Sequence, residues 1–236
     1  EPNYRSRLVA KELKKYNDWS LFAATPPWEA IKMLFSLAVS QGTGWHNGKH
    51  QGKKIEVIDV RRAYFYAKAR RNVFVELPAE DHTPGMCGEL GKSMYGTRDA
   101  GNNWEQEYSD FLILLGLARG KSVTCSFHHA TRDIQLVVHG DDFVSEGPMD
   151  NLKAMDKKLR AHFDIKTEIL GPERNCVKQL TILNRVVTWE SEGVTWEPDP
   201  RHAEIIIDQL GLTGGKPLKL PGVKDQSRRD KTIAEE

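Results

Sequence analysis

One stretch constrains the fold more than any other: Ile134 to Gly147, with the sequence IQLVVHGDDFVSEG. Two β-prone apolar runs, 134–138 and 143–144, flank the tight connection Gly140-Asp141-Asp142. Glycine followed by aspartate between such runs predicts a β-hairpin, because glycine accepts the positive φ that short primed turns need. The hairpin would present two adjacent carboxylates at its tip.

Adjacent carboxylates repel each other unless positive charge lies nearby, and hard cations such as Mg²⁺ prefer carboxylate oxygens. An isolated Asp-Asp pair is more simply explained as a solvated acidic turn. A second acid changes this balance: the segment Lys54 to Tyr66 (KIEVIDVRRAYFY) predicts a near-continuous buried strand that contains Asp59. A charge in a core strand is costly unless it is paired or metal-bound, although Asp59 alone could also cap the following turn. Together the two segments predict a three-carboxylate cluster.

The remaining apolar periodicity predicts an α+β fold, with antiparallel strands and helices packed against one face. Thr25, Pro26 and Pro27 predict a helix start with Thr25 as the N-cap. The expected helices span 28–40, a segment around 104–115 ended by Gly116, 149–162, and 200–210 with Ile206, Ile207 and Leu210 turned inward. The expected strands span 72–78, 122–129, 134–139 and 163–171, followed by a hairpin of 180–189 and 193–196.

Composition limits the class of protein. With 39% hydrophobic and 28% charged residues, the 236-residue chain resembles an ordinary globular protein with room for one large core or two small ones. No run approaches the roughly 18 apolar residues of a membrane span, and the first residues show no signal-peptide pattern. The three cysteines are widely spaced and form no CxxC pair, which predicts reduced thiols in an intracellular protein. Because the sequence begins at Glu1 rather than Met, we expect it to be a piece of a longer protein.

The net charge of +1 neither requires nor excludes a nucleic-acid partner. Basic clusters beside a predicted metal site suggest a phosphate-rich ligand. They comprise Arg5, Arg7, Lys11, Lys14 and Lys15, and then Lys53, Lys54, Arg61, Arg62, Lys68, Arg70 and Arg71. A carboxylate cluster with basic residues nearby suits two-metal phosphoryl transfer, in which two ions about 3.5–4 Å apart contact the attacking and leaving oxygens.

The motifs, in order, resemble the reverse transcriptase of copia-type LTR retrotransposons from about Tyr4 to Gly211. The similar segments are YRSRLVAKE, LFAATPPWEAIKMLFSLA, VIDVRRAYFYA, VFVELP, ELGKSMYGTRDAGNNWEQEYSDFLILLG, VVHGDDFVSEG and LRAHFDIKTEILG. The resemblance implies a fingers/palm architecture with an antiparallel palm sheet and helices on one face. It divides the chain into a reverse-transcriptase domain, 1–212 (fingers about 1–53 and 67–95, palm about 54–66 and 96–212), and a polar tail, 213–236, expected to be poorly ordered.

The resemblance also implies a catalytic set. Asp59, Asp141 and Asp142, with the backbone carbonyl of Val60, would bind two Mg²⁺ ions, with Mn²⁺ as a possible substitute. Lys166 would protonate the departing pyrophosphate, although a solvated lysine explains its sequence context equally well.

Further residues would contact the substrates. Tyr64 would act as a steric gate that excludes a 2′-hydroxyl by clash, unless it is an ordinary core aromatic. The incoming triphosphate would be contacted by Arg5 or Arg7. Residues near the template or primer would be Tyr95, Gly96, Arg98, His139 and Gly140. The chain departs from the family at two points: His139-Gly140 replaces the usual Tyr-Val, and Asp99-Ala100-Gly101 replaces Gln-Ala-Pro, which would bring a negative charge near bound nucleic acid.

The implied function is RNA-directed DNA polymerisation inside the cell, in cytoplasm or nucleus. The partners would be an RNA or DNA template with its primer, deoxynucleoside triphosphates, and the rest of a polyprotein with integrase and RNase H, but no membrane. Two alternatives remain open: a decayed or co-opted remnant that binds nucleic acid without polymerising, and a metal-dependent nuclease on an unrelated α+β fold. The polymerase and the remnant retain the same three carboxylates, so composition and spacing cannot separate them, whereas the nuclease would cleave nucleic acid without using nucleoside triphosphates.

Overall fold

The computed structural model describes residues 8–13, 21–40, 43, 45–46, 49–50 and 52–216. Arg5 and Arg7 therefore lie outside the described residues. The chain divides into two compact units, Glu1–Glu197 and Pro198–Glu236. The domain limits implied by the sequence stay a prediction.

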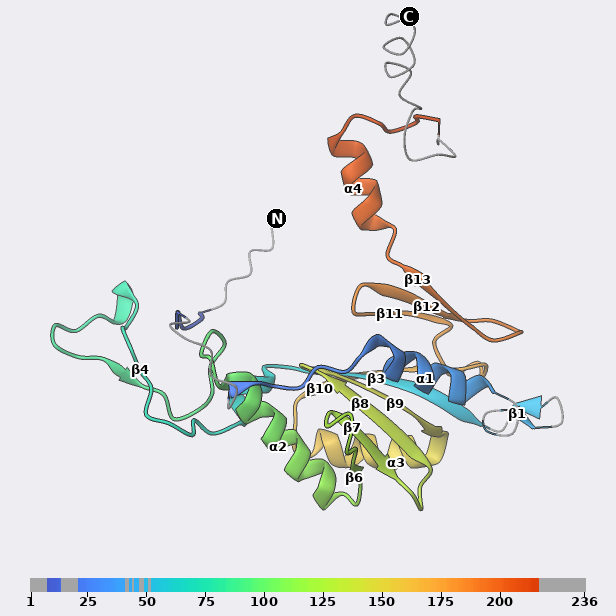
Figure 1. Cartoon of the computed structure of the whole chain (residues 1–236), viewed down its shortest axis with the longest axis horizontal. Coiled ribbons are helices and arrows are strands. Elements are labelled where there is room, and N and C mark those ends of the chain that lie inside the picture. The colour runs from blue at the N-terminus through green and yellow to red at the C-terminus, as the bar shows by residue number, and fades with distance from the viewer. Residues whose placement is uncertain are drawn as a thin grey trace, which may run out of the picture. The chain divides into compact units, whose positions relative to one another are not determined.

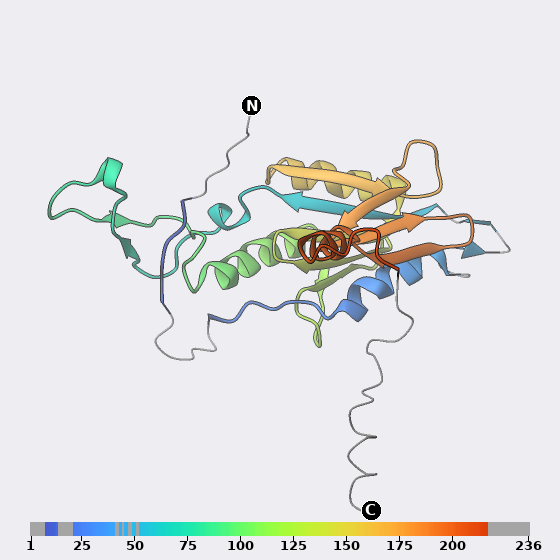
Figure 2. The ribbon, with the colours of Figure 1, turned by 90° about the horizontal axis from the view of Figure 1, so that it is seen from above.

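A six-stranded antiparallel sheet forms the centre of the first unit, as the sequence predicts (Figures 1 and 2). The spatial order of its strands is β10-β3-β9-β8-β7-β6. Their bounds are β3 Lys53–Val60, β6 Ala118–Arg119, β7 Ser126–His129, β8 Ile134–His139, β9 Asp142–Pro148 and β10 Ile165–Leu170.

The hairpin predicted at the acidic stretch is confirmed. His139 of β8 lies opposite Asp142 of β9, so the turn between them consists of Gly140 and Asp141. Gly140 has a φ of 65°, the left-handed conformation that a short hairpin turn requires. Asp142 is therefore the first residue of β9, and Asp141 lies in the turn itself.

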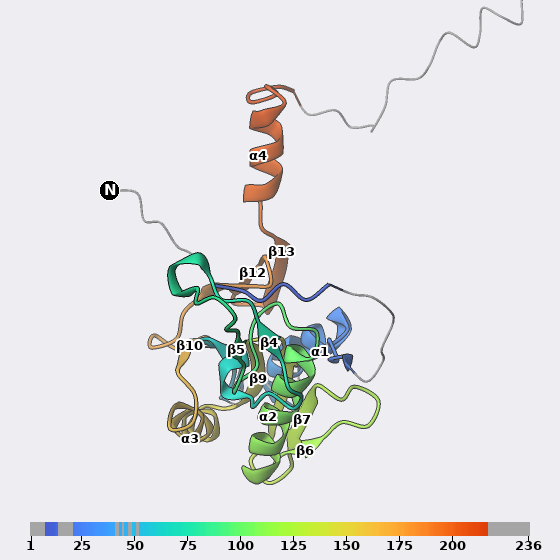
Figure 3. The ribbon, with the colours of Figure 1, turned by 90° about the vertical axis from the view of Figure 1, so that its left-hand side faces the viewer.

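Both faces of the sheet are covered, which explains why β3 is buried almost throughout, its charged residues Lys53, Lys54 and Glu56 included. On one face, helices α2 (Ala100–Leu114) and α3 (Met149–Arg160) pack against Ile58, Leu136 and Phe143. On the opposite face, helix α1 (Trp28–Val39) packs against Ile55 and Val144 (Figures 1 and 3). The expected arrangement of helices on one face thus holds for α2 and α3, while α1 lies on the other.

A second sheet of three strands shares the core under α1. Its strands are β11 (Gln179–Ile182), β12 (Arg185–Trp189) and β13 (Val194–Pro198). The sequence-based prediction of a single strand over 180–189 was wrong, because the chain turns back at Leu183 and Asn184, whose φ values are 47° and 59°. The predicted N-cap at Thr25 was also wrong: α1 starts after Pro27, which has no side chain that can cap it.

The remaining elements are short. Strands β1 (Trp45–His46) and β2 (Lys49–His50) pair with each other, as do β4 (Phe74–Val75) and β5 (Gly88–Glu89). Two 3₁₀ helices span Ala63–Tyr66 and Ala79–Asp81. In the second unit, helix α4 (Arg201–Gln209) leaves Ile206, Ile207 and Leu210 exposed, although the sequence predicted them to be turned inward. Within the described residues, no helix is both long and apolar enough to span a membrane.

Candidate active site

The predicted acids meet at one end of the central sheet. Register pairs Asp59 of β3 with Asp142 of β9 on one side and with Lys166 of β10 on the other. His139 of β8 pairs in turn with Asp142. Because directly opposite residues of antiparallel strands share a face, Lys166, Asp59, Asp142 and His139 form one row across four adjacent strands. We call these four residues the polar row.

The acidic turn beside the polar row is tied down on two sides. The backbone N–H of Val60 donates a hydrogen bond to the carbonyl oxygen of Asp141, at 3.0 Å. The indole N–H of Trp104, a buried residue of α2, donates to the carbonyl oxygen of Gly140, at 2.8 Å. The turn is therefore held by β3 on one side and by α2 on the other, which restricts where Asp141 and Asp142 can lie.

In the part of the chain that the structure describes, none of Asp59, Asp141 and Asp142 forms an ion pair, and the nearby Arg61 and Arg62 pair with Asp164 instead. Burial, together with the carboxylates of Asp141 and Asp59, raises the pKa of Asp142 to about 6. Burial and the Asp141 carboxylate also raise the pKa of the Tyr64 hydroxyl. The ammonium of Lys166 forms its ion pair with Glu168, at 3.2 Å, rather than with Asp59. The acids thus repel one another, and an added cation would relieve that repulsion.

The donor chemistry fits a hard cation such as Mg²⁺. Among the described residues, no three side chains of His, Cys, Asp or Glu converge to hold a metal ion as they stand. This arrangement is compatible with Mg²⁺, which proteins usually bind through one or two carboxylates, water and the phosphates of a substrate rather than through an all-protein cage. Asp59 and Asp141, which line the same pocket, would be the carboxylates available for such binding.

That pocket has a volume of about 690 Å³ and combines acidic, basic and aromatic groups. Its walls are formed by Leu8, Asp59, Val60, Arg61, Arg62, Phe65, Met94, Tyr95 and Asp141. Tyr64 does not line the pocket; it packs on Tyr95, with ring centroids 4.6 Å apart, while Phe65 meets Tyr95 edge-on at 5.6 Å. A pocket of this size accommodates a small-molecule ligand.

Comparison with known proteins assigns the family. Residues 1–223 match the model of the family described as "Reverse transcriptase (RNA-dependent DNA polymerase)". The chain belongs to this family. It is 24% identical over 228 residues to the retrovirus-related Pol polyprotein from transposon TNT 1-94 of Nicotiana tabacum, covering 92% of this chain and 16% of that protein. It is 26% identical over 138 residues to the transposon Ty1-BL Gag-Pol polyprotein of Saccharomyces cerevisiae, covering 58% of this chain and 8% of that protein.

The predicted copia-type reverse-transcriptase domain is therefore confirmed. The chain spans at most about a sixth of these two polyproteins, so the activities of the whole polyproteins are not transferred to it. Among solved structures, apo telomerase from Candida tropicalis, truncated from its C-terminal domain, gives a TM-score of 0.43 at 11% identity, covering 73% of this chain and 40% of that one. Candida albicans telomerase with a fragment of telomeric RNA gives a TM-score of 0.41 at 10% identity, covering 76% and 36%.

Two predicted template residues of this reverse transcriptase domain, Gly96 and Arg98, lie where an N-terminal segment crosses. The N–H of Ala10 donates to the carbonyl of Tyr95 at 2.8 Å, and the N–H of Arg98 donates to the carboxylate of Glu12 at 2.8 Å. Gly96 has a φ of 91°, and a Cβ there would lie 1.8 Å from the carbonyl oxygen of Ala10. Only glycine fits this crossing, whatever further role Gly96 has toward a template.

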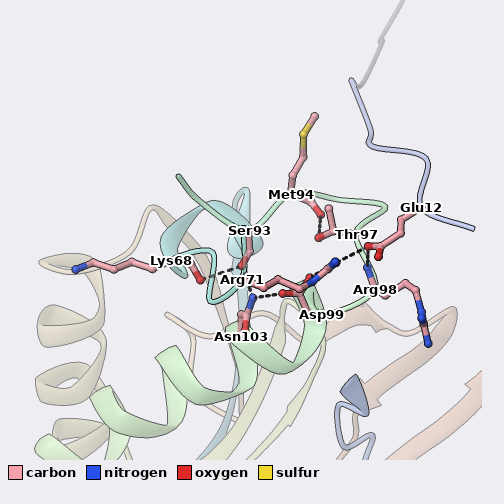
Figure 4. A network of polar contacts seen from close by, with 9 residues as sticks. All are labelled: Glu12, Lys68, Arg71, Ser93, Met94, Thr97, Arg98, Asp99 and Asn103. Carbon is pink, nitrogen blue, oxygen red and sulfur yellow. Dashed lines mark hydrogen bonds and ion pairs between the residues drawn. The ribbon is translucent and has the colours of Figure 1, made fainter. Parts of the chain in front are cut away.

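Asp99, which the sequence analysis expected to bring a negative charge near bound nucleic acid, is paired within the protein. The guanidinium of Arg71 donates to the carboxylates of both Asp99, at 2.9 Å, and Glu12, and the amide of Asn103 donates to Asp99 at 3.0 Å (Figure 4). Burial alone would raise the pKa of Asp99, but the hydrogen bonds from Arg71 and Asn103 outweigh it, so that the pKa is lowered. We call Glu12, Arg71, Asp99 and Asn103 the Arg71 cluster.

The basic residues that the sequence analysis grouped together have different environments in the structure. Lys53 and Lys54 are buried and form ion pairs with Glu146 and Glu173, so they do not provide a phosphate site. Arg61 and Arg62, by contrast, line the pocket, although the sequence analysis gave them no individual role. Their position immediately after the Asp59-bearing strand is the signal that could have singled them out.

Proposed function

We propose that this domain is an RNA-directed DNA polymerase that extends a primer with deoxynucleoside triphosphates. The observation that carries the proposal is the convergence of Asp59 with the acidic turn: Asp142 lies opposite Asp59 in register, and Asp141 shares its pocket. Membership of the reverse-transcriptase family supports this assignment. The retrotransposon polyprotein, with integrase and RNase H, is the proposed context.

In the proposed reaction the primer 3′-oxygen forms a bond to the α-phosphorus of the nucleotide. The bond from that phosphorus to the oxygen bridging to the β-phosphate breaks, and pyrophosphate leaves with the electron pair. The 3′-hydroxyl proton passes to solvent, and Lys166 would give a proton to the pyrophosphate. Two Mg²⁺ ions, or Mn²⁺, held by Asp59, Asp141, Asp142 and the carbonyl of Val60, would stabilise the charge on the attacking and leaving oxygens.

The chain's own residues would position the substrates. Asp59 and Asp141 define the reacting end of the pocket, and Trp104 and Val60 hold the turn that carries Asp141. Tyr64 would support the ring of Tyr95 from outside the pocket wall, so that its proposed discrimination against a 2′-hydroxyl would depend on how those two rings pack. His139 and Gly140 would contact the primer end, and Tyr95, Gly96 and Arg98 the template. An intracellular location is consistent with the three cysteines, all of them free thiols.

The test is primer extension on RNA and DNA templates by the wild type and by Asp141→Asn, with Mg²⁺ or Mn²⁺. We expect the wild type to extend the primer and the variant to be slower by about 10³-fold, because charge stabilisation in such sites is worth that order of rate. Asp81→Asn, which removes another exposed acid, from the short helix Ala79–Asp81, serves as the matched control and should extend normally.

Two other results would contradict the proposal. Absence of extension by the wild type, with salt-dependent template-primer binding retained, would identify a remnant that binds without polymerising. Cleavage of the nucleic acid without use of nucleotides would identify a nuclease.

A further inference from the structure

One wall of the pocket beside the acidic turn comes from the N-terminal part of the chain. Leu8 lines the pocket together with Tyr95, although the two residues lie far apart in the sequence. They meet because residues 8–12 cross the loop that carries Tyr95 and Gly96. We call residues 8–12 the crossing segment. The pocket keeps this wall only while the crossing segment stays in place.

The backbone alone gives the crossing segment little support. None of its residues belongs to a helix or strand. The N–H of Ala10 donates to the carbonyl of Tyr95 at 2.8 Å. The N–H of Glu12 makes a longer hydrogen bond to the carbonyl of Gly96, at 3.4 Å. Leu8 is 67% exposed, so burial of apolar surface contributes little at that end. A segment of this kind opens locally at a low cost in free energy unless side chains anchor it.

The carboxylate of Glu12 provides such an anchor. It accepts a hydrogen bond from the N–H of Arg98 at 2.8 Å and another from the guanidinium of Arg71 (Figure 4). The hydrogen bond from Arg71 is the main reason why the pKa of Glu12 is lowered, so the carboxylate is ionised at neutral pH. Hydrogen bonds to a charged acceptor are stronger than those between neutral groups. Glu12 therefore ties the crossing segment to the loop below it and, through Arg71, to the start of α2.

Removing Glu12 would free the crossing segment without dismantling the rest of the site. Arg71 would keep its hydrogen bond to Asp99, the N-cap of α2, at 2.9 Å. The indole of Trp104 on the same helix would still donate to the carbonyl of Gly140 in the acidic turn. The N-terminal wall of the pocket thus depends on Glu12, whereas its acidic end does not.

We propose that Glu12 is a positioning residue: by fixing the crossing segment, it keeps Leu8 and Tyr95 in the wall of the pocket that receives the incoming nucleotide. Glu12 is not among the residues that line the pocket, so its effect reaches the ligand through those two side chains. The identity of the ligand rests on the proposed function, whereas the anchoring of the segment does not. Loss of Glu12 should weaken nucleotide binding without slowing the chemical step, because the acids stay in place.

The first measurement follows the amide hydrogen of Ala10 by hydrogen exchange detected with NMR, without ligand or metal. A change at position 12 leaves its acceptor, the carbonyl of Tyr95, in the chain, so its exchange rate reports opening of the crossing segment. We expect Glu12→Ala to exchange this hydrogen about tenfold faster, because two charge-assisted hydrogen bonds are lost. Glu12→Gln, which keeps one acceptor oxygen but no charge, should give an intermediate rate.

Two controls separate local opening from a loss of overall stability. The amide of Val138, a buried residue of β8, should exchange at the wild-type rate in Glu12→Ala. Glu80→Ala removes another exposed acid and should leave the exchange of Ala10 unchanged. A wild-type exchange rate of Ala10 in Glu12→Ala would overturn the inference, and so would an equal acceleration at Ala10 and Val138.

The second measurement is primer extension at varied nucleotide concentration. We expect Glu12→Ala to raise the KM for the deoxynucleoside triphosphate about fivefold, with kcat within about twofold of the wild type, and Glu80→Ala to match the wild type in both. A fall in kcat at unchanged KM, or an unchanged KM despite faster exchange of Ala10, would overturn the positioning role. If the wild type extends no primer, the polymerase proposal fails, and the exchange rates still decide whether Glu12 anchors the crossing segment.

Discussion

The Arg71 cluster and the acidic turn are two groups of acids in one molecule with opposite electrostatics. In the Arg71 cluster, a guanidinium lies between Asp99 and Glu12, and the pKa of each of these acids is lowered. At the turn, burial and neighbouring carboxylates raise the pKa of Asp142 to about 6. In the first case the acids are paired with a cation of the protein, whereas in the second, within the described residues, none of the acids forms an ion pair.

This difference separates stability from function. A buried acid that is paired contributes to the folded state, whereas clustered acids without a cation are retained at a cost and are typical of functional sites. Helix α2 connects the two groups, because Asp99 is its N-cap and Trp104 donates to the turn. Changes in each group should therefore have effects of opposite sign on stability.

The largest effect on stability is expected for Arg71→Gln. Removing the guanidinium leaves Asp99, whose side chain is only 8% exposed, without its cation. Breaking a buried pair in this way costs about 3–5 kcal/mol, and the partial exposure of Arg71 lowers our expectation to about 2–3 kcal/mol. The measurement is the free energy of unfolding in urea.

The neighbouring Arg70 gives the matched control for this change. It is exposed, and Arg70→Gln should alter the free energy of unfolding by less than about 0.5 kcal/mol. The double variant Arg71→Gln/Asp99→Asn should recover part of the loss, because it removes the unpaired charge as well. Equal destabilisation by Arg70→Gln and Arg71→Gln would show that the cluster is only a surface contact.

A smaller effect is expected for Trp104→Phe, which cuts the link from α2 to the turn. The variant loses a hydrogen bond to Gly140 and part of a buried ring, which together are worth about 1–2 kcal/mol of unfolding free energy. Primer extension should fall by about tenfold, since small displacements of catalytic groups are costly. Tyr108→Phe, one helical turn along α2 in the same core, is the control. Unchanged extension by Trp104→Phe would mean that the turn holds its position without the indole.

The elements that the sequence predicted well are those with a local signal. Gly140 between β-prone runs predicted the hairpin and its turn, and the apolar periodicity of 28–40 predicted helix α1, in which Ile31, Leu34 and Phe35 are buried. The convergence of Asp59 with the acidic turn was also anticipated. The reason given for it, a charge buried in a core strand, was wrong, because Asp59 is the exposed residue near the end of β3. Each of these signals lies within one element or in the chemistry of one residue.

What the sequence could not show depends on contacts between distant segments. The partner of Asp99 is Arg71, 28 positions away, and the other acid bound by Arg71 is Glu12, 59 positions away. The turn at Leu183-Asn184 was missed because leucine is not a residue that usually adopts a positive φ. Likewise, the period of α1 identified its apolar side but not the face of the sheet that this side covers.

The smallest effect, and the one of opposite sign, is expected for Asp142→Asn. Because the folded-state pKa of Asp142 is raised, the folded wild type binds this proton more tightly than the unfolded chain does, and its stability falls as the pH rises from about 4 to about 6. An amide does not titrate, so the free energy of unfolding of the variant should rise relative to that of the wild type over this pH range. At pH 7.5 the variant should be more stable by about 1 kcal/mol, after allowance for solvent screening.

The quantity to compare is the difference in unfolding free energy between variant and wild type at each pH. Glu146 and Glu56, whose pKa values burial raises to about 7 and about 8, titrate in both proteins and cancel in that difference. Mg²⁺ sharpens the test: at about ten times its dissociation constant, the ion should stabilise the wild type by about 1.4 kcal/mol and the variant by less. Equal stability of the two proteins at pH 7.5 without metal would show that the acidic turn is already compensated, and the contrast with the Arg71 cluster would disappear.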